Sequence, residues 1–484
     1  MDTLQFIRQT AAEKAALISQ VNRGVWQSAE FGYSETESSA LIAQVLRGEG
    51  FAVQTGTGGL PTALEATWGQ GAPVIGILGE YDALPNLSQE AGVAEPRPIP
   101  GQKCGHGCGH SALGAGAVGA ALILKEWLQA TGTAGTVKFF GCPAEETGFG
   151  KAFMAKAGCF AGLGAALTWH PMYMNAAMAV RTVAYYKVRF DFKGRTAHAG
   201  ACPEQGRSAL DACELMNVGV NYLREHIISQ ARVHYAYLDC GGDAPNVVQE
   251  RASLLYFVRA PKLTDSAAIL ERIKKIAQGA ALMTETEVTV TVLGGLSDTV
   301  PNPTLSKLLS DSFTALGGPD FGEEEYAIAR RYLAALTPEA RAAVLAEGAK
   351  LNGVTEDEFA LRPLNTAVIP FQPQMMAVVT TGSSDVGDVS YLVPTAQLTA
   401  ATAIPGTGPH TWQFTGQVGT SIGDKGSQAA ARAIALAAAR LFEQPALLET
   451  AKQELLAETG GRYQSPIPSG ISYTDVNPKT PGQA

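Results

Sequence analysis

The sequence predicts an α/β protein with two domains, and three observations support this prediction. The chain has 484 residues, too many for a single hydrophobic core. In its first third, short apolar runs alternate with helical patterns, as in a mostly parallel sheet with helices on its faces. From residue 182 to residue 296 the order of elements becomes β-α-β-β-α-β, which is that of a ferredoxin-like α+β domain. We therefore predict a parent domain, residues 1–181 and 297–484, that is interrupted by an inserted domain, residues 182–296.

The parent domain is expected to begin with an amphipathic helix over Leu4–Gln27. Ser34 and Glu37 have the spacing of a capping box, which predicts a second helix that runs to about Arg47. A helix rich in alanine and glycine follows, and its small side chains allow close packing on a sheet. This helix is predicted over Ser111–Gln129. The three strands around it are predicted over Val74–Leu78, Thr136–Phe140 and Ala165–Thr168.

The inserted domain is predicted to contain four strands and two helices, over Val183–Phe192, Ser208–His226, Arg232–Cys240, Ser253–Arg259, Asp265–Ala281 and Glu287–Leu293. After it, the charged and alanine-rich stretch 317–374 predicts a solvated helical hairpin without chemistry. Lys425–Leu441 is the predicted final helix, with a small apolar face. The tail after Glu458 is rich in proline, glycine and serine and is expected to be extended.

The composition excludes several classes of partner. A formal net charge of −9 and the lack of a Lys/Arg stripe argue against nucleic acid. No apolar run looks long enough to span a bilayer, and the first residues lack the pattern of a signal peptide. Seven cysteines are an odd number without the spacing of a disulfide scaffold, which suits a reducing cytoplasm. We expect a cytoplasmic protein that acts on a small molecule or a peptide.

Three clusters of chemically capable side chains each follow the carboxyl end of a predicted strand. They are Glu80-Tyr81-Asp82, Glu145-Glu146 and His170-Pro171, and Cys108 and His110 stand in a glycine-rich run between the first two. Open α/β sheets bind ligands at the carboxyl ends of their strands, so we expect these clusters to form one site. Thiolate, imidazole and carboxylate are ligands of zinc-type divalent metals.

Each cluster alone has a simpler explanation. A glycine-rich loop can carry Cys and His incidentally, and adjacent glutamates are common on solvated surfaces. A histidine behind an apolar strand is more often a hydrogen-bonded core residue than a ligand, and the loop residue His410 is similarly ambiguous. Together, however, the candidates supply five ligands, enough for two divalent ions, Zn or Mn, that share one bridging group. They are Cys108, His110, Glu146, His170 and His410.

Ordered motifs along the chain are similar to those of a known family. They are Tyr81-Asp82-Ala83-Leu84-Pro85, Cys108-Gly109-His110, Pro143-Ala144-Glu145-Glu146, Trp169-His170-Pro171, Gly194-Arg195-Thr196-Ala197-His198 and Pro409-His410. Over essentially its whole length the chain resembles the co-catalytic metal amidohydrolases, which include carboxypeptidase G, aminoacylase, hippuricase and the plant auxin-conjugate hydrolases. Further runs, such as Ala244–Gln249 and Ser384–Ser390, resemble the branch that uses aminobenzoyl-glutamate.

The resemblance implies a zinc-peptidase-like catalytic domain and an inserted lid that also dimerises. It implies a dinuclear site with Glu145 as the general base and with Asp82 orienting a ligand. His198 corresponds to a histidine that completes the site of the neighbouring subunit. The ligands it implies are the five candidates above, and the expected substrate-binding residues are Asn246, Arg259 and Ser383.

Two positions depart from the family pattern. Glu80 stands where many relatives have a metal-binding histidine, a loss that the Cys-Gly-His run offsets, and Ser111 stands where auxin-conjugate hydrolases carry aspartate. The expected reaction is hydrolysis of p-aminobenzoyl-glutamate, or of a similar N-acyl amino acid, by a metal-bridged hydroxide. The alternatives are a dipeptidase or N-acyl-amino-acid hydrolase, and a non-catalytic partner subunit of a paralogous hydrolase. The expected assembly is a homodimer, or a heteromer with such a paralogue.

Overall fold

The computed structural model describes residues 2–476 and contains two main sheets from different parts of the chain. Eight strands form the larger sheet, in the order β1-β2-β6-β3-β7-β14-β8-β13: Ala52–Thr55, Leu64–Gln70, Gly135–Cys142, Val74–Glu80, Ala165–Met172, Thr395–Ala401, Asn175–Ala177 and Val368–Ile369. Four strands form the smaller sheet, in the order β10-β11-β9-β12: Arg232–Asp239, Arg251–Ala260, Ala184–Lys193 and Glu287–Leu296. A short ladder joins β4 (Leu84–Pro85) to β5 (Cys104–Gly105).

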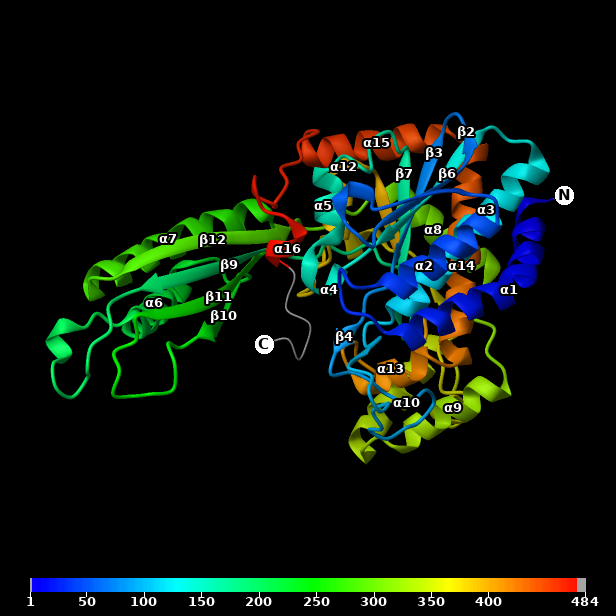
Figure 1. Cartoon of the computed structure of the whole chain (residues 1–484). Helices are drawn as coiled ribbons and strands as arrows, with labels where there is room; N and C mark the ends of the chain where they lie inside the picture. The colour runs from blue at the N-terminus through cyan, green and yellow to red at the C-terminus, as the bar shows by residue number, and fades with distance from the viewer. Residues whose placement is uncertain (1, 477–484) are drawn as a thin grey trace.

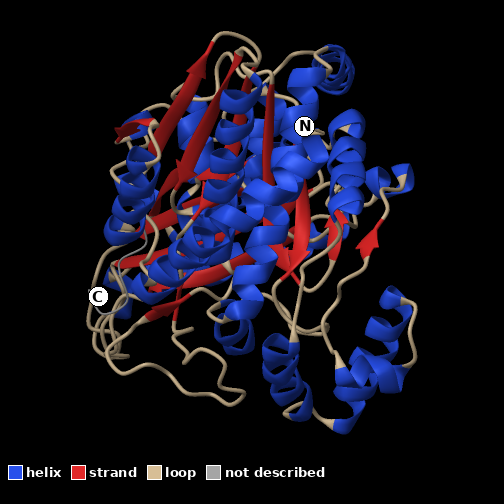
Figure 2. Cartoon of the chain, turned by 90° about the vertical axis from the view of Figure 1, so that its right-hand side faces the viewer, coloured by secondary structure: helices blue, strands red, loops and turns tan. Residues whose placement is uncertain are grey.

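Helices cover the larger sheet, and Figure 2 shows its strands running between them. The helices of this body are α1 (Thr3–Ser28), α2 (Thr36–Gly48), α3 (His110–Thr131), α4 (Glu145–Gly148), α5 (Gly150–Lys156), α8 (Pro303–Leu316), α9 (Glu323–Ala334), α10 (Pro338–Asn352), α11 (Glu356–Leu361), α12 (Val386–Leu392), α13 (Trp412–Val418), α14 (Ser421–Glu443), α15 (Ala446–Thr459) and α16 (Tyr473–Val476). The smaller sheet carries α6 (Ala209–Leu223) and α7 (Leu263–Thr284).

The centre of the larger sheet is parallel, as predicted, because β6, β3, β7 and β14 pair in parallel. The strands β1 and β2 add antiparallel pairs at one edge, and β8 runs antiparallel to β14 at the other. The expected α/β class is therefore confirmed. The parallel strands of the centre all end at the same edge of the sheet, and the chemically capable residues gather at that edge.

Helix α3 forms the centre of the main core and packs against α1, α14 and the sheet. Its small residues allow this closeness, since a Cβ atom on Gly116 would lie 2.6 Å from the indole nitrogen of Trp169. By length and mean hydropathy, 1.3, this helix could cross a membrane, but 94% of the apolar window is buried inside the protein. It therefore has the surroundings of a core helix.

The inserted segment forms an antiparallel sheet with α6 and α7 on one face. Its strand order is that of the predicted ferredoxin-like arrangement. Figure 1 shows this part of the chain, in green, as an arm that extends from the body around the larger sheet. The two connecting segments meet where the hydroxyls of Thr182 and Thr299 lie 2.6 Å apart.

The predicted capping box at the start of the second helix is wrong. Helix α2 begins at Thr36 with Glu35 as its N-cap residue, and the Glu35 side chain forms no capping hydrogen bond. Instead the Glu30 carboxylate accepts hydrogen bonds from the amides of Glu37 and Ser38, both at 2.9 Å. The Glu30 carboxylate, which precedes the helix by several residues, thus satisfies its first free amides. The three-residue spacing of a capping box cannot identify such a cap.

The C-terminal half differs from the prediction in three ways. The stretch 317–374 is not a solvated hairpin, because α9, α10 and the segment after α11 contribute to a small apolar core that includes Tyr332, Val344 and Leu364. Helix α14 is not the last one and is mostly buried, while α15 and α16 follow it. The tail after Glu458 is also partly folded, since Ile467 and Val476 are buried. Residues 477–484 of that tail lie outside the described part.

We predict that Gly116→Ala lowers the free energy of unfolding by about 1–3 kcal/mol, the usual cost of overpacking a core. The added methyl group would overlap the rigid Trp169 ring. Gly279→Ala in α7 is the matched control, because a Cβ atom there has no neighbour within 4 Å. It should stabilise its helix by about 0.5–1 kcal/mol. Chemical denaturation of both variants is the measurement, and equal effects would contradict the close packing of α3.

Candidate active site

Four segments bring the predicted metal ligands to one edge of the larger sheet. Cys108 and His110 lie at the start of α3, and Glu146 lies in α4, directly after β6. His410 lies in the loop between β14 and α13, where its amide donates a 2.7 Å hydrogen bond to the Gly107 carbonyl. His170 lies inside β7 and not behind it as predicted, because β14 extends the ladder to Met172.

The five candidate ligands form two overlapping groups. The ligand atoms of Cys108, His110 and His170 lie within 4.8 Å of one another, and so do those of Cys108, Glu146 and His410. The Cys108 Sγ atom is 3.5 Å from His170 Nε2, and Glu146 Oε2 is 3.4 Å from His410 Nε2. Ligand atoms that share one ion lie about 3–4 Å apart, since each metal bond is about 2.0–2.3 Å long. Cys108 is common to both groups and is therefore placed to bridge them.

The residues present fit divalent metal ions. The Nδ1 atom of His110 donates to Asp82 Oδ1 at 2.7 Å, so Nε2 is the ring nitrogen left to hold a cation, which would replace a proton there. Both His110 Nε2 and Glu146 Oε1 are buried without a hydrogen-bond partner among the described residues. Buried polar atoms are rarely left in this state unless they contact a ligand or an ion.

The two adjacent glutamates have opposite electrostatic environments. Burial, followed by the charges of Glu80, Asp385 and Glu146, raises the pKa of Glu145 well above its usual value. Burial also acts to raise the pKa of Glu146, but the hydrogen bond with His410 and the charge of His110 outweigh it and lower that pKa to about 2. Glu146 is thus held as a carboxylate, while Glu145 readily takes up a proton.

The backbone that carries these glutamates is held by buried carboxylates. Ala144 adopts a left-handed conformation, with φ of 54°, so that the chain turns sharply after β6. Its amide donates to Glu35 Oε1 at 2.8 Å, and the amide of Glu146 donates to Asp82 Oδ2 at 3.0 Å. The sequence analysis missed Glu35, because nothing in its spacing connects it with a turn more than a hundred residues away.

Three more charged residues lie behind the ligands and were not predicted to do so. Glu80 Oε2 is 3.3 Å from His110 Nε2, and Glu80 forms a third group of ligand atoms with His110 and Glu145. Lys151 pairs with Glu80 and with Asp385, and all three are buried. In the sequence, Glu80 was marked by its departure from the family pattern, and Asp385 by the run Ser384–Ser390. Nothing in the sequence around Lys151 indicated that it lies near the site.

His106, in the same glycine-rich run as the ligands, does not face the metal groups. Burial lowers the pKa of His106 to about 3, so its ring is neutral. Its Nε2 atom donates to the carbonyl of Val25 at 3.0 Å, which ties the run to the end of α1. We regard it as a structural residue.

The predicted residues of the inserted domain do not join the metal-ligand groups within this chain. His198 is exposed, and its Nδ1 atom accepts hydrogen bonds from the amides of Gly200 and Ala201. Asn246 is also exposed and lies beside His198, since its carbonyl accepts from the Ala199 amide at 2.9 Å. Nε2 of His198 is therefore the atom left free to act on something outside this chain.

Arg259 and Ser383 do meet across the two domains. The Nη1 atom of Arg259 donates to Ser383 Oγ at 3.3 Å, and the guanidinium lies 4.9 Å from the centre of the Tyr185 ring. Its Nε atom is buried and has no partner among the described residues. A guanidinium with an unpaired N–H donor is suited to binding a carboxylate.

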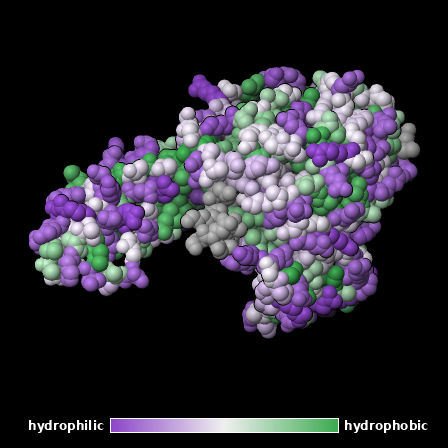
Figure 3. All heavy atoms as spheres, viewed as in Figure 1, coloured by the Kyte–Doolittle hydropathy of each residue, from purple (hydrophilic) through white to green (hydrophobic). Residues whose placement is uncertain are grey.

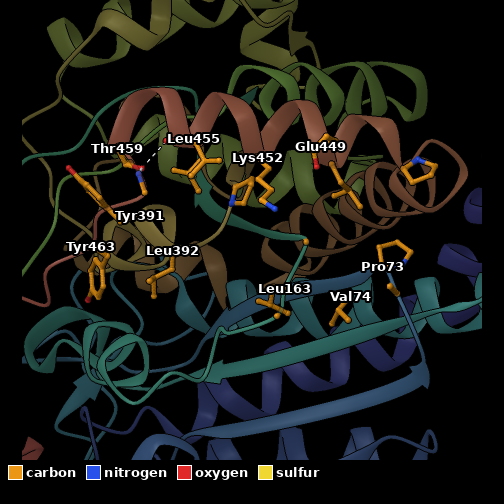
Figure 4. A pocket seen from close by; sticks show the side chains of 18 residues that line it. Pro73, Val74, Leu163, Tyr391, Leu392, Glu449, Lys452, Leu455, Thr459 and Tyr463 are labelled. Atoms are coloured by element: carbon orange, nitrogen blue, oxygen red, sulfur yellow. Dashed lines mark hydrogen bonds between the residues drawn. The ribbon is translucent and has the colours of Figure 1, made fainter.

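A separate cavity of about 570 Å³ lies at the opposite ends of the strands (Figure 4). It is lined by residues next to the start of β3, such as Val74 and Leu163, and by α15, including Leu455. The metal-ligand groups follow the carboxyl ends of the strands, so this cavity is not the candidate active site.

The comparisons with known proteins agree with this geometry. Residues 76–342 match the family model described as Peptidase family M20/M25/M40. The chain belongs to this family. It is 43% identical over 451 residues to one of the subunits of p-aminobenzoyl-glutamate hydrolase from Escherichia coli (strain K12), across 93% of this chain and 94% of the relative. It is 28% identical to the Xaa-Arg dipeptidase of Mus musculus, across 93% and 92% of the two chains.

Solved structures show the same fold. An aminobenzoyl-glutamate utilization protein from Klebsiella pneumoniae aligns with a TM-score of 0.56 at 18% identity, over 90% of this chain and 98% of its own. A Bacillus subtilis protein described as a dinuclear metal binding peptidase from M20 family aligns with a TM-score of 0.55 at 17% identity. The alignment covers 89% of this chain and 99% of that protein. The predicted family and enzyme class are confirmed: the chain is a metal-dependent hydrolase of amide bonds.

We predict that the wild-type protein loses stability as the pH rises, and that the Glu35→Gln variant does not show this loss. Burial, followed by the charge of Asp82, raises the pKa of Glu35 from 4.5 to about 8. The carboxyl group therefore stabilises the fold fully below its unfolded pKa, and this contribution is lost as the pH rises through about 8. Glutamine resembles the protonated form and does not titrate.

Thermal unfolding between about pH 6 and about pH 9 measures this difference, which should reach a few kcal/mol. The exposed Glu37→Gln, in the first turn of α2, is the control and should follow the wild type. Parallel pH profiles for Glu35→Gln and the wild type would contradict the prediction.

Proposed function

We propose that this chain hydrolyses an N-acyl amino acid with a free carboxylate on its amine half, and that p-aminobenzoyl-glutamate is the first candidate. The observation that carries the proposal is the convergence of five ligand side chains and Glu145 at one edge of the sheet. The name of the 43% identical relative supports the choice of substrate.

In the proposed mechanism Glu145 moves the protons. Bound divalent ions would supply a polarised water molecule and an electrophile for the amide carbonyl. The ligands would be Cys108, His110, Glu146, His170 and His410, with Asp82 orienting the ring of His110. Glu145 accepts a proton from the attacking water and delivers it to the leaving amine. Its raised pKa suits a group that must hold that proton between the two steps.

We further propose that Arg259 binds the carboxylate of the substrate. Its side chain is fixed by stacking on Tyr185 and by the contact with Ser383, while its Nε donor is left over. The Tyr185 ring also packs against Phe149, with ring centroids 5.7 Å apart, at the end of the helix α4 that carries Glu145. Asn246, beside the exposed His198, would contact the substrate of the neighbouring subunit.

A dipeptidase activity is the second candidate, because a Xaa-Arg dipeptidase is similar over 93% of this chain. A panel of p-aminobenzoyl-glutamate, dipeptides that end in arginine and N-acyl aromatic amino acids would separate the two on metal-loaded protein. We expect the glutamate conjugate to give the highest kcat/KM. A metal-loaded chain that hydrolyses none of them would favour the third hypothesis, a non-catalytic partner subunit.

We predict that Glu145→Gln retains the fold and about two divalent ions per chain, but loses about two to four orders of magnitude in kcat, the usual worth of a general base. The substituted side chain is not a ligand in the proposed site, so the ion content should not change. Elemental analysis of protein purified without chelator and a steady-state assay are the measurements. Near-normal turnover would assign the base to another residue.

The inserted domain offers a surface for assembly into dimers. One face of α6 exposes Leu215, Val218 and Tyr222, which are 38%, 51% and 75% exposed. The neighbouring edge strand β10 exposes Tyr237 and Leu238. Figure 3 shows the generally hydrophilic surface of this arm, with separate hydrophobic residues on the visible side. An edge strand beside apolar side chains is a common site of association.

We propose that a second copy of this chain covers that surface, and that a paralogous chain can replace it. The alternative rests on the names of two Escherichia coli relatives, which denote two different subunits of p-aminobenzoyl-glutamate hydrolase; this chain is 43% identical to one and 28% identical to the other. We also propose a cytoplasmic location, because all seven cysteines are free thiols. Light scattering with size-exclusion chromatography, and fractionation of cells, test the assembly and the location.

We predict that His198 acts on the active site of the neighbouring subunit. It is exposed, lies outside the metal-ligand groups of its own chain and presents Nε2 outward. Mixing inactive His198→Ala protein with inactive Glu145→Gln protein should therefore restore part of the activity. Each mixed dimer would hold one site with both intact residues.

Differently tagged chains must first show that subunits exchange. A mixture of His198→Ala with wild-type protein provides the reference for activity diluted by an inactive subunit. If exchange occurs and the two inactive variants stay inactive together, the histidine acts within its own chain or has no catalytic part.

A further inference from the structure

Lys151 is a fully buried lysine that the proposed mechanism does not use. It lies in α5, directly behind the turn that carries Glu145 and Glu146. Its ammonium group is 2.6 Å from Glu80 Oε1 and also contacts Asp385 Oδ1, and its amide donates to Asp385 Oδ2 at 2.7 Å. Ammonium groups are rarely buried without a structural or functional reason, because desolvation is costly.

The second oxygen of Glu80 faces the metal-ligand groups. Glu80 Oε2 lies 3.3 Å from His110 Nε2, and both atoms are buried without a hydrogen-bond partner among the described residues. Asp82 Oδ1 lies 2.7 Å from His110 Nδ1, so Nε2 is the ring nitrogen that faces the Glu80 oxygen. The ligand atoms of Glu80, His110 and Glu145 lie within 4.8 Å of one another, so one cation could contact both Glu80 and His110. Atoms that share one ion are about 3–3.4 Å apart when each bond is about 2.0–2.1 Å long.

We propose that Lys151 is a positioning residue that holds the Glu80 carboxylate by one oxygen, so that the other oxygen contacts the metal ion bound by His110. Glu80 is then a sixth protein ligand group, in addition to the five of the proposed function. The inference rests on the metal site of that function, but not on its substrate.

The same contacts would hold the loop that leads to α12. Asp385 precedes α12, which packs against α5, and Ser383 in the same loop contacts Arg259 of the inserted domain. Lys151 therefore connects the metal pocket with the proposed carboxylate site. A purely structural lysine would only neutralise the two buried carboxylates, and this alternative makes a different prediction.

The experiment compares Mn²⁺ binding by four variants with the wild type. Glu80→Gln removes the proposed ligand charge. Lys151→Met/Asp385→Asn removes the anchor of Glu80 but keeps the net charge of the cluster, whereas Lys151→Met leaves two buried carboxylates unpaired. Lys125→Met is the matched control, because Lys125 is also buried and pairs with Glu49 at the other end of α3. Competition with a fluorescent chelator measures affinity, and thermal unfolding checks the fold.

We expect Glu80→Gln and the double variant each to lose about 10–100-fold in affinity for one Mn²⁺ ion, the usual effect of removing a group that supports a metal site. Lys125→Met should bind Mn²⁺ as the wild type does. Even if Lys151→Met alone does not fold, the charge-matched double variant still tests the proposal. Wild-type affinity in a folded double variant would show that Lys151 only balances charge, and wild-type affinity in Glu80→Gln would remove Glu80 from the site.

Failure of the proposed function gives a different result. A wild-type chain that hydrolyses none of the panel substrates, while the variants show the expected loss of Mn²⁺ affinity, would refute the substrate assignment and leave the role of Lys151 intact.

Discussion

The candidate site depends on one carboxylate, that of Asp82. One oxygen accepts the Nδ1 proton of His110, and the other accepts the amide proton of Glu146. A single buried side chain at the end of β3 thus fixes the start of α3 and the turn after β6 relative to each other. Because each ligand group contains members from different segments, small displacements of these segments would separate the ligand atoms.

Around this carboxylate, the protein buries several ionisable groups and satisfies them locally. Glu35 accepts the Ala144 amide and the Thr62 hydroxyl, and Lys151 lies between Glu80 and Asp385. Without these partners each buried group would carry the full cost of desolvation. The arrangement keeps a negatively charged pocket that suits divalent cations, and it raises the pKa of Glu145 through burial and nearby like charges. Stability and chemistry therefore depend on the same contacts.

The inserted domain has a different role, because its core is separate from that of the larger sheet. Its contribution to the site enters through Arg259 near the domain junction and through the exposed His198 farther out. The first is placed to recognise a substrate carboxylate within the chain. The second has no partner group in its own chain's metal site, which is why assembly matters to the proposed mechanism.

The sequence by itself determined the α/β class and predicted the inserted β-α-β-β-α-β unit and five candidate ligands, because these depend on periodicity and on residue types near strand ends. Ordered motifs also gave the family. Only the tertiary structure decided which buried charges support the site: Glu35, Glu80, Lys151 and Asp385 come from segments far apart in the chain. It likewise decided that Glu30 caps α2 and that α9 and α10 contribute to a small apolar core. Contacts of this kind arise from the packing of distant segments, and no local spacing encodes them.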